Sequence, residues 1–133
     1  MTYDAAEWHR ESVIEHDLRP TAASTHIAMF MAWLALHELT RPKFARAELL
    51  ARIISPGQYL RHFCRDQFDE SMLTDTGNAF TKAVYEQYRA EYAKLPVAAQ
   101  SDSFYGAPDN WDTYEEVATL VNHLFRAWQN RSG

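Results

Sequence analysis

Apolar side chains recur along this chain at helical spacing, and short turns with proline, serine or glycine separate the segments. Residues 22–39, AASTHIAMFMAWLALHEL, are apolar on nearly every face in their middle. A helix that is hydrophobic all round is surrounded by other elements. The stretch therefore predicts a central helix, and Pro20 just before it suits a first helical turn.

Amphipathic segments follow this central stretch. Residues 43–54 predict a helix, and Ser55-Pro56-Gly57 has the cap and proline that start another, shorter one. Residues 78–95 predict a long helix, because large apolar side chains recur there every four positions. The side chains expected to face inward are Phe44, Leu49, Leu50 and Ile53 in the first segment, Tyr59, Leu60 and Phe63 in the second, and Phe80, Val84, Tyr88 and Tyr92 in the third.

The last helix is predicted from a capping box at Asp112-Thr113-Tyr114-Glu115. In this motif Asp112 accepts a backbone N–H and Glu115 reaches back to the cap. The stripe that follows suits packing against a bundle. Its members are Tyr114, Val117, Leu120, Val121, Leu124, Phe125 and Trp128.

The remaining segments are less regular. Residues 3–16 have helical composition but a poor stripe, residues 66–77 are predicted as an acidic loop, and residues 96–110 as the longest loop. No strand is predicted, because β-branched residues never alternate over five or more positions. We therefore predict an all-α fold: a single compact bundle of five to six helices around the central helix, with residues 1–133 forming one helical domain.

Composition fits a globular domain. The chain has 133 residues, 47% hydrophobic and 14% aromatic, which is too apolar for a disordered protein. Cys64 is the only cysteine, so no intrachain disulfide is expected and a reducing compartment is favoured. The first residues lack the features of a secretory signal, and the longest apolar run, residues 27–36, falls short of the about 20 residues of a membrane span. We expect a cytoplasmic protein without a membrane segment.

The charge argues against nucleic acid as a partner. The chain carries 18 acidic and 13 basic residues, a net charge of −5, and its only lysines are Lys43, Lys82 and Lys94. Nucleic-acid binding needs clustered basic side chains. A mildly acidic surface suits a basic protein partner, although this charge is also ordinary for solubility.

The six histidines raise the question of metal or acid–base chemistry. His9, Glu11 and His16 form the minimal ligand set of a zinc or iron site. Two turns of helix, about 10 Å, would separate the two histidines, which is too far for one ion. We therefore predict no metal, no cofactor and no catalytic residue, and keep a small histidine–carboxylate enzyme, nuclease-like or metal-dependent, as the alternative function.

His26 and His37 bracket the central helix. Buried histidines must pair their ring nitrogens, so we expect structural histidines, with His26 beneath the Tyr3-Asp4 segment. The competing interpretation is that Arg19 and His26 resemble the loosely spaced Arg/His pair of helical ribonucleases.

Several aromatic residues lie outside the apolar stripes, namely Trp8, Tyr59, Phe104, Tyr105 and Trp111. Aromatic anchors with a charged rim are typical of protein-binding surfaces. The alternative is that these rings fold back over the end of the bundle. The residues predicted to bind a partner are Phe104, Tyr105, Asp109, Trp111, Asp112, Glu115 and Glu116.

Three segments carry a resemblance to a known family. They are Tyr3-Asp4-x-Ala6-x-Trp8-His9, then Thr25-His26-Ile27-x-Met29-Phe30-x-Ala32-Trp33-Leu34, then Gly77-Asn78-Ala79-Phe80 with Tyr85 and Tyr88, and the late Trp111, Tyr114 and Trp128 also fit. With these segments the chain resembles an uncharacterised family of small bacterial proteins. Between His9 and Arg19 it departs from the looser acidic turn expected of that family.

Members of this family resemble immunity proteins of toxin–immunity pairs. The resemblance implies a cytoplasmic inhibitor that binds and occludes a cognate protein toxin, as a monomer or homodimer. It carries over no catalytic residue. The alternatives that stay open are the histidine–carboxylate enzyme and a structural homo-oligomer whose aromatic patch is a symmetric interface.

Overall fold

The computed structural model describes residues 1–100 and 103–132. The predicted helical fold is confirmed, with one small two-stranded sheet in addition. Short 3₁₀ turns connect several of the elements. The elements of the described chain are β1 (Thr2–Ala5), α1 (Arg10–Glu15), α2 (Thr25–Leu36), α3 (Ala47–Leu50), α4 (Pro56–Phe63), β2 (Gln67–Asp69), α5 (Asp75–Tyr92), α6 (Pro96–Ala99) and α7 (Trp111–Ser132).

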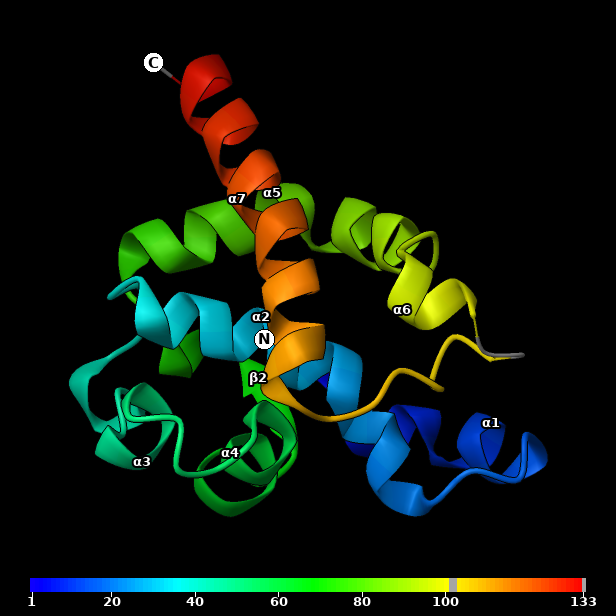
Figure 1. The fold of residues 1–133 in the computed structure, drawn as a ribbon. Coiled ribbons are helices and arrows are strands. Elements are labelled where there is room, and N and C mark those ends of the chain that lie inside the picture. Colours follow the sequence, from blue (N-terminus) through cyan, green and yellow to red (C-terminus); the bar gives the residue numbers. More distant parts are fainter. Residues whose placement is uncertain (101–102, 133) are drawn as a thin grey trace.

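Helix α2 lies at the centre in the view of Figure 1, with α4 below it, α5 above it and α7 crossing in front of it. Every residue of α2 from Thr25 to Ala35 is buried. The predicted central helix is therefore confirmed, although it is shorter than residues 22–39. The 3₁₀ turn Pro20–Ser24 precedes it, and His37 ends it.

The N-terminus forms a strand where the sequence predicted none. β1 pairs antiparallel with β2, and the ladder places Asp4 opposite Phe68 and Ala5 opposite Gln67. β2 falls in the segment predicted as an acidic loop. The two strands have four and three residues, which is too short for an alternating pattern, and only two residues of β1 and one of β2 are buried. The helix expected over residues 3–16 is reduced to the 3₁₀ turn Ala6–His9 and α1.

The amphipathic helix predicted over residues 43–54 is wrong. The chain instead forms the 3₁₀ turn Pro42–Phe44 and the single helical turn α3. A left-handed residue, Arg52 with φ of 57°, reverses the chain soon afterwards. Phe44 and Leu49 are buried as expected, but Leu50 is 48% and Ile53 74% exposed. A stripe assigned on the assumption of continuous helix points in the wrong direction once the helix is broken.

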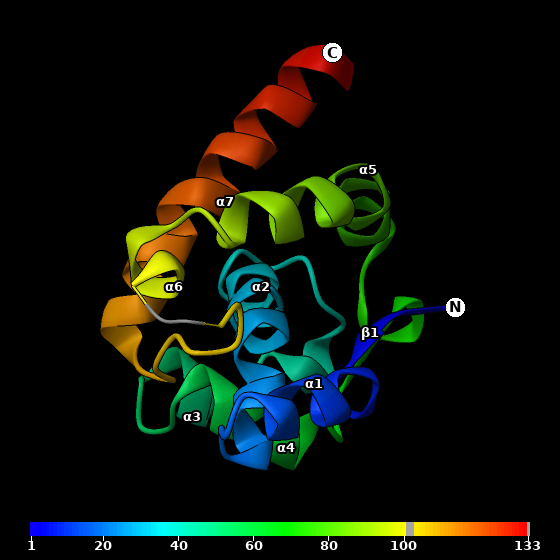
Figure 2. The ribbon, with the colours of Figure 1, turned by 90° about the vertical axis from the view of Figure 1, so that its right-hand side faces the viewer.

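The last helix is confirmed, but its predicted capping box is wrong. α7 begins at Trp111, so Asp112 lies inside the first turn. The side chain of Asn110 accepts the backbone N–H of Thr113 at 2.8 Å and takes the capping role instead. Phe125 and Trp128 pack against Phe80 of α5. The C-terminal turns of α7 extend beyond the body of the molecule, as Figure 2 shows.

The predicted loop over residues 96–110 contains α6 and a second segment, residues 103–110, and its positions 101–102 lie outside the described residues. The segment 103–110 runs from the side of α6 to the start of α7 and passes close to the N-terminal elements (Figures 1 and 2). This course brings residues 103–110 close to the N-terminal segment, where Tyr105 reaches His9.

Candidate functional site

The N-terminal strand buries a carboxylate. Asp4 lies on β1 and is 1% exposed. The backbone N–H of Ala5 donates to Asp4 Oδ1 at 2.9 Å. Because a buried charge is costly unless it is paired and hydrogen-bonded, the other acceptor positions of this carboxylate need donors.

Two histidines meet this carboxylate. The 3₁₀ turn Ala6–His9 folds the chain back, so that His9 Nε2 lies 2.6 Å from Asp4 Oδ1. His26, in the first turn of α2, has its Nε2 3.1 Å from Asp4 Oδ2. The two imidazole rings meet edge to face, with centroids 4.6 Å apart. Asp4, His9 and His26 form one buried group, which we call the Asp4 cluster.

Helix α5 holds the Asp4 cluster against the core. Tyr85 donates its hydroxyl to Asp4 Oδ2 at 2.7 Å, and Tyr88 donates to the carbonyl of His26 at 2.6 Å. On the same helix, Asn78 accepts the hydroxyl of Tyr3 at 2.6 Å. The three sequence segments that carried the family resemblance therefore meet around the Asp4 cluster.

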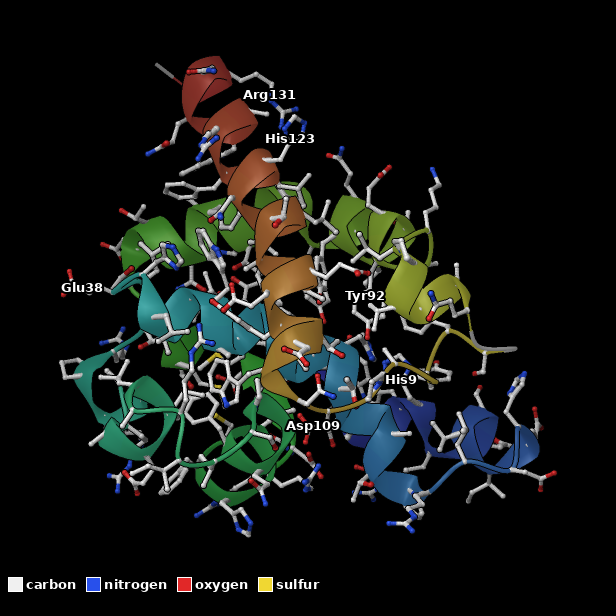
Figure 3. All side chains as sticks on the ribbon, in the orientation of Figure 1. His9, Glu38, Tyr92, Asp109, His123 and Arg131 are labelled. Carbon is white, nitrogen blue, oxygen red and sulfur yellow. The ribbon has the colours of Figure 1, made fainter. Side chains whose placement is uncertain are left out.

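The segment 103–110 covers the Asp4 cluster. The hydroxyl of Tyr105 lies 2.7 Å from His9 Nδ1. The ring of Phe104 meets the rings of His26 and Tyr92, with centroid distances of 4.9 and 5.2 Å. Figure 3 shows His9 and Tyr92 near this segment. Phe104 and Tyr105 thus fold back over the bundle, as the alternative interpretation of these rings expected.

Burial and hydrogen bonding shift the pKa values of Asp4 and His26 in the cluster. Burial acts to raise the pKa of Asp4, but hydrogen bonds from His26 and His9 outweigh it and hold this pKa far below its usual range. Burial lowers the pKa of His26 to about 4, although Asp4 opposes this shift. Burial also raises the pKa of Tyr85 well above its ordinary value. An ionised carboxylate therefore faces a neutral imidazole at His26 and a neutral phenol at Tyr85.

Two of the acids predicted to bind a partner are engaged within the molecule. Asp109 accepts hydrogen bonds from Ser55 Oγ at 2.6 Å and from the backbone N–H of Gly57 at 2.8 Å, and so holds the start of α4. Glu116 accepts the backbone N–H of Val97 at 2.8 Å and anchors α6. Both carboxylates have a structural role in the folded chain.

Three further predicted residues lie together at the start of α7. Trp111 donates its ring N–H to the carbonyl of Ile54 at 3.0 Å, and the guanidinium of Arg52 lies 4.5 Å from the centre of its ring. Glu115 forms an ion pair with the same Arg52, and Asp112 is exposed. These residues adjoin the turn that carries the exposed Leu50 and Ile53. Of the residues predicted to bind a partner, Trp111, Asp112 and Glu115 thus lie together at the start of α7, whereas Phe104 and Tyr105 lie over the Asp4 cluster.

A pocket of about 230 Å³ opens beside the cover of the Asp4 cluster. Tyr105 lines it together with Arg19, Arg61 and Asp109. Arg61 Nη2 lies 3.8 Å from Asp109 Oδ2. Within the described residues, the side chains of the Asp4 cluster do not line this pocket, because Tyr105 stands between them.

The histidines are placed differently from most expectations. The expected position of His26, buried beneath the Tyr3-Asp4 segment, is confirmed. The expected burial of His37 is wrong, since His37 is exposed and stacks on Trp33 at 3.9 Å. His16 is exposed and bonds the carbonyl of Ser12, so it does not join His9. The sequence argument considered only a pair of His9 with His16 on one helix. It missed that a strand and a 3₁₀ turn bring His9 to Asp4.

Two other residues considered in the sequence, Tyr59 and Cys64, are buried in the structure. Tyr59, which the sequence placed both in the apolar stripe of its helix and among the possible surface aromatics, is fully buried and donates its hydroxyl to the carbonyl of Phe44 at 2.6 Å. Cys64 is a buried free thiol, and burial raises its pKa to about 12. Neither residue offers reactive chemistry to solvent.

A comparison with family models decides the family. The model described as "Domain of unknown function (DUF7832)" matches residues 2–107. The chain belongs to this family. The resemblance to an uncharacterised family is thereby confirmed at that level, and the matched DUF7832 residues include the whole Asp4 cluster with Tyr85 and Tyr105. No curated protein and no solved structure matches the chain. Within the described residues, no helix has the length and apolar character needed to cross a membrane.

Proposed function

We propose that this DUF7832 chain is a binding protein of the immunity type, which acts in the cytoplasm by covering a basic surface of a cognate protein toxin. One observation carries the proposal: Ile53 and Leu50, 74% and 48% exposed, lie in the segment whose Ile54 carbonyl accepts the ring N–H of Trp111. Apolar side chains grouped on a surface mark interaction sites. We call Leu50, Ile53, Trp111, Asp112 and Glu115 the Ile53 patch.

The Ile53 patch has the chemistry of a binding hot spot. Tryptophan and arginine are enriched among the residues that dominate interface energies. Here the indole of Trp111 is fixed by its hydrogen bond to the carbonyl of Ile54 and by the guanidinium of Arg52 over its ring. A side chain held in place before binding loses less conformational entropy when a partner docks.

The charge of the patch favours a basic partner. Asp112 is exposed at the start of α7, and Glu115 keeps a 57% exposed side chain although it pairs with Arg52. The chain as a whole carries −5. An acidic rim on an acidic protein speeds encounter with a positively charged surface and disfavours acidic competitors. Occlusion of a basic toxin surface is the inhibitory mechanism that follows.

The histidine–carboxylate enzyme is less well supported. His9 and His26 are 6% and 1% exposed, and their carboxylate partner is equally buried. A general acid or base must come within hydrogen-bond reach of its substrate. Arg19, the second member of the ribonuclease-like pair, is exposed and lines the pocket from which His26 is shielded.

The proposal predicts a toxin gene beside the gene of this chain, and the toxin domain encoded there is the partner used in the test. Isothermal titration calorimetry compares wild-type chain with Ile53→Asp and Trp111→Ala, and we expect each variant to weaken binding at least about tenfold, or 1.4 kcal/mol. Matched controls are Ile14→Asp and Trp8→Ala, because these side chains are 62% and 61% exposed on the N-terminal elements.

Unchanged affinity in both patch variants, with helical circular dichroism retained, contradicts the proposal. An affinity lost equally in the controls would place the interface on the N-terminal elements instead. Light scattering of the free chain separates the homo-oligomer: a stable dimer that Ile53→Asp converts to monomer would assign the patch to self-association.

A further inference from the structure

We propose that Asp4, His9 and His26 bind a divalent transition metal of the zinc class, in an interior site with three protein ligands that stabilises the fold. The site would join the N-terminal strand and its 3₁₀ turn to the central helix α2. This inference is independent of the proposed toxin binding, because it concerns the interior of the opposite part of the chain from the Ile53 patch.

The ligand atoms already converge. One ligand atom from each of Asp4, His9 and His26 can be chosen so that all three lie within 4.8 Å of one another. Zinc binds imidazole nitrogen and carboxylate oxygen at about 2.0–2.2 Å, so two ligands of a tetrahedral ion lie roughly 3.4 Å apart. Asp4 lies 2.6 and 3.1 Å from the two nitrogens, and modest opening of the first contact admits the ion.

The donor set has a defined chemical preference. Two imidazoles and one carboxylate suit Zn²⁺, Co²⁺ or Fe²⁺ rather than Mg²⁺ or Ca²⁺, which prefer oxygen ligands. Neutral imidazole is the form that coordinates a metal. Coordination of His9 through Nε2 places its ring proton on Nδ1, which faces the hydroxyl of Tyr105 at 2.7 Å.

The charge around Asp4 also favours a cation. Buried charges in proteins are paired or coordinate metals. Within the described residues, the ion-pair partners of Asp4 are His9 and His26 alone, and no lysine or arginine lies within ion-pair distance. The buried carboxylate of Asp4 therefore has only imidazole groups at ion-pair distance among the described residues, and a divalent ion between the three groups would supply positive charge.

Neighbouring groups orient two of the three ligands, Asp4 and His9, as they do in metal centres, whereas Nδ1 of His26 is buried without a hydrogen-bond partner among the described residues. A metal-bound histidine usually has a polar partner for its second ring nitrogen, and the ligating carboxylate is itself hydrogen-bonded. Tyr105 OH lies 2.7 Å from His9 Nδ1 and accepts its proton in the metal-bound tautomer. Tyr85 OH and the backbone N–H of Ala5 both donate to Asp4.

The experiment uses tag-free full-length chain freed of metal with a chelator. Titration with Co²⁺ is followed by visible absorption, and competition with Zn²⁺ gives the affinity. We expect one equivalent to bind with the spectrum of a four-coordinate site, and Zn²⁺ to raise the melting temperature. His9→Asn should lower the affinity by about 100-fold or more, and Tyr105→Phe, which removes the partner of His9 Nδ1, by about tenfold.

Matched controls use two exposed histidines. His16→Asn and His123→Asn remove imidazoles that lie outside the Asp4 cluster, His123 on the projecting part of α7 (Figure 3), and should leave the affinity unchanged. Tyr105→Phe keeps every ligand, so it reports on the site even if His9→Asn fails to fold. Absence of the Co²⁺ spectrum and of a melting shift in wild type overturns the proposal, as does binding that depends on the control histidines.

Discussion

The Asp4 cluster and the Ile53 patch reverse the usual distribution of polar and apolar groups in opposite ways. Asp4 and His26 are 1% exposed although they are polar, whereas Ile53 is apolar and 74% exposed. Among the described residues, the carboxylate and ring nitrogens of the cluster, apart from His26 Nδ1, have hydrogen-bond partners within the chain. Ile53 instead keeps most of its side chain in solvent. The comparison suggests that the cluster serves the fold and that the patch serves a partner.

The largest expected effect comes from removing the centre of the cluster. Asp4→Ala leaves His9, His26, Tyr85 and the N–H of Ala5 without their acceptor, and each buried unpaired group costs about 1–3 kcal/mol. We expect a loss of about 4 kcal/mol in the free energy of unfolding, measured by urea denaturation of metal-free protein. Asp112→Ala, at an exposed site, should change stability by less than about 0.5 kcal/mol. Equal losses in the two variants would remove the contrast between the regions.

The next effect is on pH dependence. The pKa of His26 is about 4 in the folded chain, against about 6.5 for an unperturbed histidine. Between these values the unfolded chain binds a proton that the folded chain does not, so stability is complete above about pH 6.5 and falls as the pH drops towards 4. The 2.5-unit difference corresponds to roughly 3 kcal/mol.

Denaturation of metal-free protein across this range measures the loss. The lowered pKa of Asp4 acts in the same direction, since its contribution is lost only at still lower pH. His26→Asn should flatten the profile between pH 6.5 and 4, and His62→Asn, at an exposed position, should leave it unchanged. A wild-type profile that stays level through this range would show that His26 ionises in the folded chain.

A smaller loss of stability is expected from removing the hydroxyl of Tyr59, which holds the turn before α3. Tyr59 donates to the carbonyl of Phe44 from beneath the segment that precedes α3. Tyr59→Phe keeps the ring and leaves this buried carbonyl without its donor, so we expect a loss of about 1–2 kcal/mol in thermal or urea unfolding. A neutral result would mean that water replaces the hydroxyl and that the turn is held by other contacts.

The smallest expected effect separates surface from core. Ile53→Ser should change the free energy of unfolding by less than about 0.5 kcal/mol, because this side chain is largely in solvent. Leu49→Ser, four positions earlier and fully buried, should cost about 3 kcal/mol or more. Parallel chemical denaturation of the two variants tests the reassigned stripe. A large loss in Ile53→Ser would restore the inward orientation that the sequence predicted.

These two regions also mark where the sequence was informative. The all-round apolar run of α2 and the four-residue stripe of α5 predicted their helices because helical periodicity over many residues has few competing interpretations. The broken segment around α3 was misjudged because a left-handed turn at Arg52 leaves no signal in periodicity. The patch side chains Leu50 and Ile53 were consequently placed inside.

The Asp4 cluster was beyond sequence reasoning for a different physical reason. Asp4 and His9 are brought together by a short strand followed by a 3₁₀ turn, and Tyr105 reaches them from 96 positions away. These long-range contacts depend on the pairing of β1 with β2, and neither strand is long enough for its hydrophobic pattern to predict that pairing. The expectation that His26 lies beneath Tyr3-Asp4 succeeded because a histidine on the most apolar helix must find a polar partner.

The central claim is that fold and binding are divided between the two regions, and one paired measurement tests it most directly. Melting temperature and calorimetric affinity for the neighbouring toxin domain are determined for Ile53→Asp and for Tyr105→Phe. We predict that Ile53→Asp loses affinity at least about tenfold without a change in melting temperature. We predict that Tyr105→Phe, whose missing hydroxyl faces His9 in the interior, melts earlier with unchanged affinity. The reverse assignment, or affinity and stability falling together in both variants, would contradict the account.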